Sequence, residues 1–185
     1  MRRRWLGIVL LLAGCSFFSR TKNQIYTIDP VPPAAAIRAV RGVPVAIDVV
    51  QLPPGADRRE IAVRQANQKL DVRGTELWST TLQPLVLQTL AVDLAKRLPE
   101  GMVVLPGETK PAAMRSIDVV FEDLAPGPAS SIAVDAQWKL RESGRPDIAH
   151  HEQFTVDVPS LDSANIASGM SQALAMLADR IAAQL

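Results

Sequence analysis

The sequence predicts an α+β domain of two layers, in which two helices pack on one face of a mainly antiparallel sheet. Several short segments alternate apolar and polar residues, which is the pattern of strands with one buried face. Two longer stretches place apolar residues three or four positions apart, which is the pattern of amphipathic helices. The order is strands, helix, strand, three strands, helix, and this order predicts an α+β arrangement that buries every apolar stripe.

The first half of the chain is predicted to contain short strands. Residues 24–28 are β-branched and aromatic, and the proline-rich residues 29–33 form an extended connection, because proline cannot donate to a β ladder. Residues 43–50 and 60–64 alternate apolar and polar side chains. Residues 69–72 are the candidate hairpin partner of 60–64.

The first helix is predicted over residues 78–98. Trp78 opens it, and Thr80 or Thr81 caps its N-terminus. Pro84 then lies in the first turn, where the missing N–H of proline costs nothing. Apolar residues recur every four positions to the end of this range, where a Pro-Glu-Gly sequence stops the helix.

Polar positions on this helix include Asp93 and Arg97. The continuous apolar run that follows, residues 102–105, predicts a strand covered on both faces. Three further alternating segments predict an antiparallel meander with one solvated face: residues 116–122, 131–141 and 154–158. Trp78 and Trp138 are interpreted as core residues.

The last element is predicted to be a helix over residues 162–185. Its apolar stripe includes Leu174 and Leu177, at helical spacing. Gly169 lies inside it and is expected to weaken it by ~1 kcal/mol relative to alanine.

The N-terminus has the composition of a secretory signal peptide over residues 1–14. A basic start is followed by an apolar run over residues 5–12 and then by small residues. Spanning a bilayer takes roughly 20 apolar residues, so this run is too short for a transmembrane helix.

The signal ends in Leu-Ala-Gly-Cys at residues 12–15, which looks like a bacterial lipobox. In such signals a lipid is attached to the cysteine thiol and the chain is cut before it. Cys15 is the only cysteine, so the sequence predicts lipid attachment there, with residues 15–24 as a lipidated tether and 25–185 as a single domain. The alternative is an ordinary signal peptide beside a lone cysteine.

The predicted mature chain is slightly acidic. The full chain has 20 Lys+Arg and 19 Asp+Glu, and removing residues 1–14 with their three arginines leaves 17 against 19, a net charge of −2. That balance supplies no basic field for nucleic acid. Once Cys15 carries a lipid, no thiol remains for a disulfide, and stability must come from packing.

The residues give no constellation for catalysis, metal binding or a cofactor other than the lipid on Cys15. The chain lacks the spacing of a phosphate-binding loop and of a nucleophile elbow. His150 and His151 are adjacent, so on a strand they point to opposite faces and cannot share a metal. They are interpreted as solvated or edge-strand residues, and Glu122 and Asp123 as part of a solvated face.

Several stretches together resemble the ABC-type transport auxiliary lipoprotein family, the PqiC-like proteins. The features that carry the resemblance are the lipobox and residues 26–30, 49–53, 57–64, 77–78 and the helix that starts at 82. The meander and the last helix extend it over nearly the whole chain. The chain departs from the family pattern at 54–57, which has no aromatic where Pro-x-Tyr-Leu is frequent, and at 79–81, which has Ser-Thr-Thr.

The resemblance implies a periplasmic lipoprotein that serves an ABC transport system for lipids, anchored in the outer membrane. Such systems contain an ATPase, a permease and an MCE-type protein that bridges the envelope. The lipoprotein would dock on the MCE partner and would not be an enzyme. Ser16 agrees with an outer-membrane location, because lipoproteins retained in the inner membrane generally have Asp after the cysteine.

Two other functions are weighed against this one. A structural or assembly lipoprotein of another outer-membrane complex is the main alternative, and a lipid-anchored hydrolase ranks last. The predicted partner contact is the charged segment that contains Asp57, Arg58 and Arg59, or the solvated face of the meander. A homo-oligomer is left open.

Overall fold

The computed structural model describes residues 22–33 and 42–185. The elements, in chain order, are β1 (Gln24–Tyr26), β2 (Val45–Gln51), β3 (Glu60–Arg64), β4 (Leu70–Trp78), α1 (Leu82–Ala95), β5 (Val103–Val104), β6 (Arg115–Gly127), β7 (Ser131–Glu142), β8 (Ile148–Asp157) and α2 (Ser163–Ala182). The predicted signal peptide and Cys15 lie outside the described residues.

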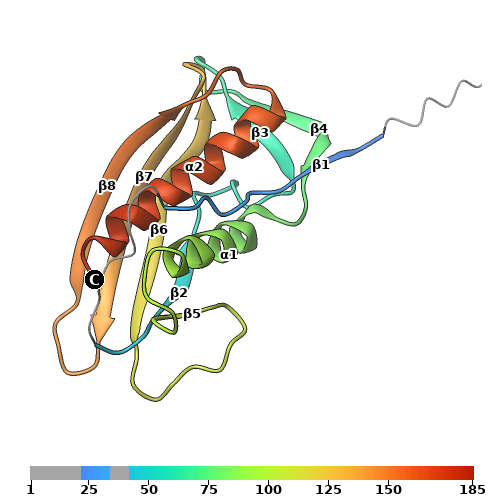
Figure 1. Ribbon diagram of the computed structural model, residues 1–185. Coiled ribbons are helices and arrows are strands. Elements are labelled where there is room, and N and C mark those ends of the chain that lie inside the picture. Colours follow the sequence, from blue (N-terminus) through green and yellow to red (C-terminus); the bar gives the residue numbers. More distant parts are fainter. Residues whose placement is uncertain (1–21, 34–41) are drawn as a thin grey trace, which may run out of the picture.

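The strands form two mixed sheets, which Figure 1 shows side by side. The small sheet has the order β1-β4-β3, with β1 parallel and β3 antiparallel to β4. The large sheet has the order β5-β2-β6-β7-β8. In it β2 runs parallel to both β5 and β6, and β6, β7 and β8 form an antiparallel meander.

The predicted α+β class and the meander are confirmed, but the sheet is divided in two and gains parallel pairs. The alternation within a strand reports which side chains are buried. It does not report which neighbour the strand pairs with or in which direction. Those depend on how the chain crosses between strands.

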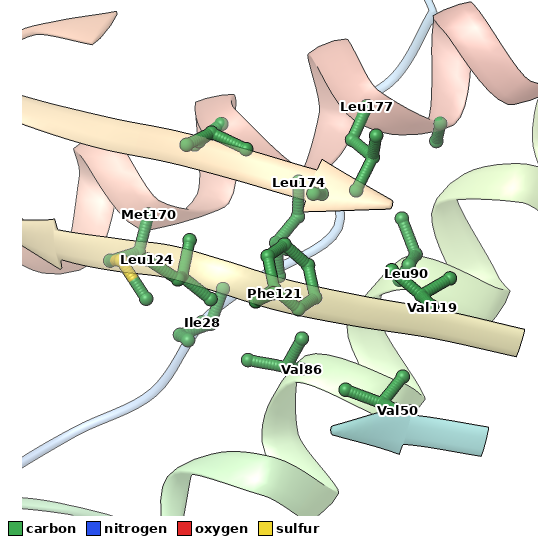
Figure 2. Close-up of a cluster of buried hydrophobic side chains, with 14 of the residues drawn as sticks. Ile28, Val50, Val86, Leu90, Val119, Phe121, Leu124, Met170, Leu174 and Leu177 are labelled. Atoms are coloured by element: carbon green, nitrogen blue, oxygen red, sulfur yellow. The ribbon is translucent and has the colours of Figure 1, made fainter. Parts of the chain in front are cut away.

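Both helices cover one face of the large sheet, as predicted (Figure 1). Figure 2 shows the apolar cluster between the layers, which joins side chains of both helices, β2, β6 and the segment after β1: Ile28, Val50, Val86, Leu90, Val119, Phe121, Leu124, Met170, Leu174 and Leu177. Full burial of one such side chain contributes about 1.5–3 kcal/mol. No helix in the described parts of the chain is long and apolar enough to cross a bilayer.

The helix ends have different capping arrangements. Thr81 is the N-cap of α1, but its side chain makes no capping hydrogen bond. The carboxylate of Asp57 accepts a hydrogen bond from the backbone N–H of Gln83 instead, at 2.9 Å. Asp162 is the N-cap of α2 and accepts the N–H of Asn165 with its own side chain, at 2.9 Å. Each carboxylate thus satisfies a backbone donor that a helix leaves free.

Several predicted boundaries are wrong, and β4 and β6 extend well beyond the predicted residues 69–72 and 116–122. Trp78 is the last residue of β4 and does not open α1, although it is buried as expected. The strand predicted at 102–105 is only β5, at the edge of the large sheet and covered less than expected, with Val103 half-buried. The third strand of the meander begins at Ile148, earlier than predicted, and includes both histidines.

The connection after β1 crosses both helices and is hydrogen-bonded to each. The hydroxyl of Thr89 on α1 donates to the carbonyl of Ile28 at 2.9 Å. The hydroxyl of Ser171 on α2 accepts the N–H of Asp29 at 3.0 Å. These bonds fasten the N-terminal side of the domain, to which the predicted tether would connect, onto the helical layer.

Candidate functional site

A half-open groove of about 540 Å³ lies where the two sheets meet. It is bordered by the loop after β2, by β3 and the start of β4, and by the distal half of β6, and it reaches down to α1 and α2. Its lining residues are Pro53, Pro54, Gly55, Ala56, Arg58, Glu60, Ala62, Arg64, Gln68, Leu70, Trp78, Leu82, Glu122, Asp123, Leu124, Ala125, Pro126 and Met170.

The groove exists because strands of unequal length meet there. β2 pairs with β6 only as far as Val120, opposite Gln51, while β6 continues to Gly127 with β7 on its other side. Residues 121–127 of β6 therefore have no hydrogen-bonded strand on the β2 side within the described chain, and β3 packs beside them instead. β3 is the edge strand of the small sheet and borders the same gap. A bulge between Phe121 and Asp123 re-aims the side chains of β6 at this point.

The floor of the groove is apolar. It consists of Trp78 from the end of β4, Leu82 from the start of α1, Leu124 from β6 and Met170 from α2, and all four are buried. Two elements of the helical layer and both sheets therefore meet at the floor.

The rim of the groove is charged. The Arg64 guanidinium forms a two-pronged ion pair with the Asp123 carboxylate, with Nη1 to Oδ2 at 2.9 Å, which joins the two sheets. This hydrogen bonding with Asp123 raises the pKa of Arg64 above its ordinary value, against the effect of burial. Arg58 Nε donates to the Gly55 carbonyl at 2.7 Å. Glu122 accepts a hydrogen bond from the neutral Gln137 amide at 2.7 Å.

The three residues predicted to contact a partner are adjacent in sequence, but their side chains do not lie at one site. Asp57 is exposed but caps α1, and so has a structural task. Arg58 lines the groove. Arg59 is exposed, while its backbone carbonyl accepts the N–H of Trp78 at 2.6 Å. Of the three side chains, only that of Arg58 therefore belongs to the groove.

The second predicted contact surface is the solvated face of the meander, where two carboxylates are paired with side chains of neighbouring strands. His151 Nε2 lies 2.7 Å from an Asp135 carboxylate oxygen, and the Gln153 amide donates to the other oxygen at 3.1 Å. Arg141 forms an ion pair with Asp118. The carboxylates of Asp118 and Asp135 thus already have partners on this face.

The two histidines of β8 point to opposite faces, as predicted. His150 stacks on the buried Trp138, with ring centroids 4.0 Å apart and planes 12° from parallel. His151 lies on the open face beside Asp135. Within the described residues no group of three or more His, Cys, Asp or Glu side chains is arranged to hold a metal.

A buried ionic cluster that the sequence pattern does not reveal lies between α1 and α2. Asp93 is 0% exposed and Arg97 is 4% exposed. The Asp93 carboxylate accepts the N–H of Val31 at 2.8 Å, and Arg97 donates to the Val31 carbonyl at 3.2 Å. Arg97 also contacts Asp179 of α2, with Nε to Oδ1 at 2.6 Å. The i, i+4 spacing of Asp93 and Arg97 indicates an ion pair, but it does not distinguish a buried pair from an exposed one.

The buried carboxyl of this cluster titrates abnormally. Burial raises the pKa of Asp93 from 3.8 to about 6, although Arg97, the Val31 N–H and Lys96 favour the ionised form. One of its oxygens has no hydrogen-bond partner among the residues that the structure describes. The cluster fastens the segment after β1 to both helices and lies apart from the groove, so its role is structural.

Two solved structures are similar to this chain in fold. A crystal structure described only as that of an uncharacterized protein is similar with a TM-score of 0.72 and 14% identity, over 88% of this chain and 98% of the other. Protein XCC0632 from Xanthomonas campestris, of the family model DUF330, is similar with a TM-score of 0.59 and 16% identity, over 86% and 92% of the two chains. At these identities the likeness concerns the fold.

No curated protein has a sequence that matches this chain. The model of one protein family does match, over residues 26–182, which is nearly all of the described domain. The family is described as the ABC-type transport auxiliary lipoprotein component. The matched range begins within β1 and ends with α2, so it includes both sheets, both helices and the groove. The chain therefore belongs to the ABC-type transport auxiliary lipoprotein component family.

Proposed function

We propose that this protein is an outer-membrane-anchored, periplasmic accessory component of an MCE/ABC-type transport system for lipids. It acts without catalysis, by docking on the MCE protein that bridges the two membranes. The observation that carries the proposal is the family match over residues 26–182. Lipid transport, the MCE partner and the outer membrane are the finer parts of the proposal and come from the resemblance.

The N-terminal motif supports the membrane part of the proposal. A lipid on Cys15 would hold the domain at a membrane surface, since two or more acyl chains anchor a protein stably where one does not. Ser16 after the cysteine supports sorting to the outer membrane. Tethering raises the local concentration of the domain near any partner at that surface, so a weak contact suffices.

Isolation of the protein from intact envelopes tests this function. Chemical crosslinking in cells is followed by purification through a C-terminal affinity tag, and the co-purified proteins are identified by mass spectrometry. We expect an MCE protein, together with the permease or ATPase of the same system. Membranes are also separated on a density gradient, where the protein is expected in the outer-membrane fraction.

The same experiment distinguishes the proposed function from that of a structural or assembly lipoprotein. Recovery of another outer-membrane assembly, with no MCE or ABC component, would favour a structural or assembly lipoprotein. Recovery in the inner-membrane fraction would contradict the anchoring part of the proposal. Copies of the same chain carrying a second tag report whether the protein is a homo-oligomer.

A further inference from the structure

We infer that the groove between the two sheets binds a basic, extended peptide segment of a partner protein, which inserts an apolar side chain onto the Trp78 floor. This inference rests on the proposed docking function for the identity of the partner, but the groove chemistry can be tested without that partner. Three properties of the groove support it.

The first property is free backbone beside the groove. β3 pairs only with β4, and residues 121–127 of β6 pair only with β7. Each therefore has a second edge without a hydrogen-bonded strand in the described parts of the chain, although the two edges approach each other at the Arg64–Asp123 ion pair. Unpaired strand edges offer N–H and C=O groups to which an extended peptide can hydrogen-bond. A peptide is thus better suited to this site than a compact small molecule.

The second property is an apolar surface larger than the floor. Ala62 pairs with Val72 and Arg64 pairs with Leu70, so these four side chains share one face of the small sheet. Leu70 is 46% exposed and Val72 is 42% exposed, in contrast to Ile61 and Val63, which are buried on the opposite face. The start of α2 lies on the opposite face, where Arg73, the partner of Ile61, donates to the hydroxyl of Ser163 at 2.6 Å. The face that carries Leu70 and Val72 continues from the groove as an exposed apolar surface that a partner side chain can cover.

The third property is the charge of the rim, which selects the kind of partner. Two arginines, Arg58 and Arg64, face three carboxylates, those of Glu60, Glu122 and Asp123. Asp123 is neutralised by Arg64, while Glu122 is hydrogen-bonded only to a neutral amide. The rim thus has one more carboxylate than arginine, and neither Glu60 nor Glu122 forms an ion pair within the described residues. It favours a lysine or arginine of the partner and disfavours an anionic lipid headgroup.

The comparison with the solvated face of the meander points to the same site. There the carboxylates of Asp118 and Asp135 already contact Arg141 and His151. A partner would have to break those pairs before making its own contacts. At the groove it would gain apolar burial and pair a free carboxylate, which is the composition of an energetically important contact region.

The test uses the mature lipidated protein in detergent and random dodecapeptides displayed on phage as the probe. Peptides selected on the wild type are synthesised with a fluorophore, and their binding is measured by fluorescence anisotropy. The groove is blocked with Ala62→Trp, and its charge is reversed with Glu60→Lys. Lys139→Glu, at an exposed position of β7 on the solvated face, is the matched charge control.

We expect the selected peptides to contain an apolar residue next to Lys or Arg. Their affinity should fall by at least about tenfold in Ala62→Trp and Glu60→Lys and stay unchanged in Lys139→Glu. Replacing the peptide's basic residue by Glu should restore binding to Glu60→Lys, which a merely damaged fold would not do. Selection of no peptide, of acidic peptides, or of peptides that bind Ala62→Trp normally would overturn the inference. Displacement of the peptide by phosphatidylglycerol micelles at equal affinity would identify a lipid site instead.

Co-purification from cells shows whether the groove inference or the proposed function fails, because the two predict different results for the groove variants. If the MCE protein co-purifies equally with the wild type and both groove variants, the function stands and the groove is not its docking site. If the wild type recovers no such protein but the peptides behave as expected, the groove stands and the partner is of another class.

Discussion

The buried carboxyl of Asp93 should make the stability of this protein depend on pH in a direction opposite to that of an ordinary ion pair. Its pKa is raised from 3.8 to about 6, first of all by burial. Between these values the folded protein holds a proton on Asp93 that the unfolded chain has lost. The unfolded state then binds fewer protons, so the free energy of unfolding falls as pH rises through this range and is constant above about 6.

The size of the effect follows from the shift. A rise from 3.8 to about 6 corresponds to about 3 kcal/mol of stability lost between acidic and neutral pH, at about 1.4 kcal/mol per pKa unit. Asp93→Asn cannot ionise and keeps an oxygen for the Val31 N–H. Relative to the wild type, the variant should therefore become more stable by up to about 3 kcal/mol as the pH is raised from about 4 to about 7.

The assay is urea denaturation of the mature protein at a series of pH values, followed by tryptophan fluorescence, since Trp78 and Trp138 are both buried. The difference between variant and wild type is the measured quantity. Glu76, whose pKa is lowered by the hydrogen bond from Ser163, and Asp162, whose pKa is lowered by Ser160, are present in both proteins and cancel in it.

A control variant on the same helix distinguishes the effect of the Asp93 charge from a general loss of stability. Thr89→Val removes the hydrogen bond to the Ile28 carbonyl without changing a titratable group. It should lower stability by about 1 kcal/mol at every pH, parallel to the wild type. If the difference between Asp93→Asn and the wild type were equally independent of pH, Asp93 would be ionised in the folded state throughout, and the reasoning from its burial would be refuted.

Three further predictions concern the anchor and the packing of α2. Cys15→Ala should abolish labelling by a radioactive fatty acid and leave the protein uncut or soluble, and labelling that persists would exclude Cys15 as the lipid site. Leu174→Ala removes a side chain that is buried in the cluster of Figure 2 and should cost ~2–5 kcal/mol of unfolding free energy, measured by urea denaturation; an unchanged midpoint would mean that α2 is not packed. Gly169→Ala should destabilise the protein despite the higher helix propensity of alanine, because the added methyl would lie 2.9 Å from an Ile132 carbon and closer still to Val158; a higher melting temperature would refute this.

The sequence by itself determined the features that depend on local periodicity and chemistry. The stripe with Leu174 and Leu177 placed α2 on the core, and the alternation around Trp138 identified the central strand of the meander. The lipobox at Cys15 is also read from the sequence, and lipid attachment there stays a prediction. The two inferences about α2 and the meander are confirmed because burial of one face imposes a period of 2 on strands and 3.6 on helices, whatever the neighbours are.

Only the tertiary structure decided which residues meet across long separations. Residues 29–33 appeared to be a proline-rich connection, but they cross both helices, and their contacts bury Asp93 and Arg97 on a helix whose sequence marks those positions only as polar. Gly169 appeared to be a weak point of α2, but it allows Ile132 and Val158 to approach the helix backbone.

The groove was also predictable from the sequence only in part. Arg58 could be singled out from its charged segment, but Arg64, Asp123 and the Trp78 floor could not be assigned to one site, because they come from different elements and both sheets. Their meeting depends on β2 ending at Gln51 while β6 continues to Gly127, and on the small sheet lying against that free edge. Strand ends and sheet contacts of this kind result from the packing of the whole chain, and the pattern within each strand is the same whether a neighbouring strand is present or absent.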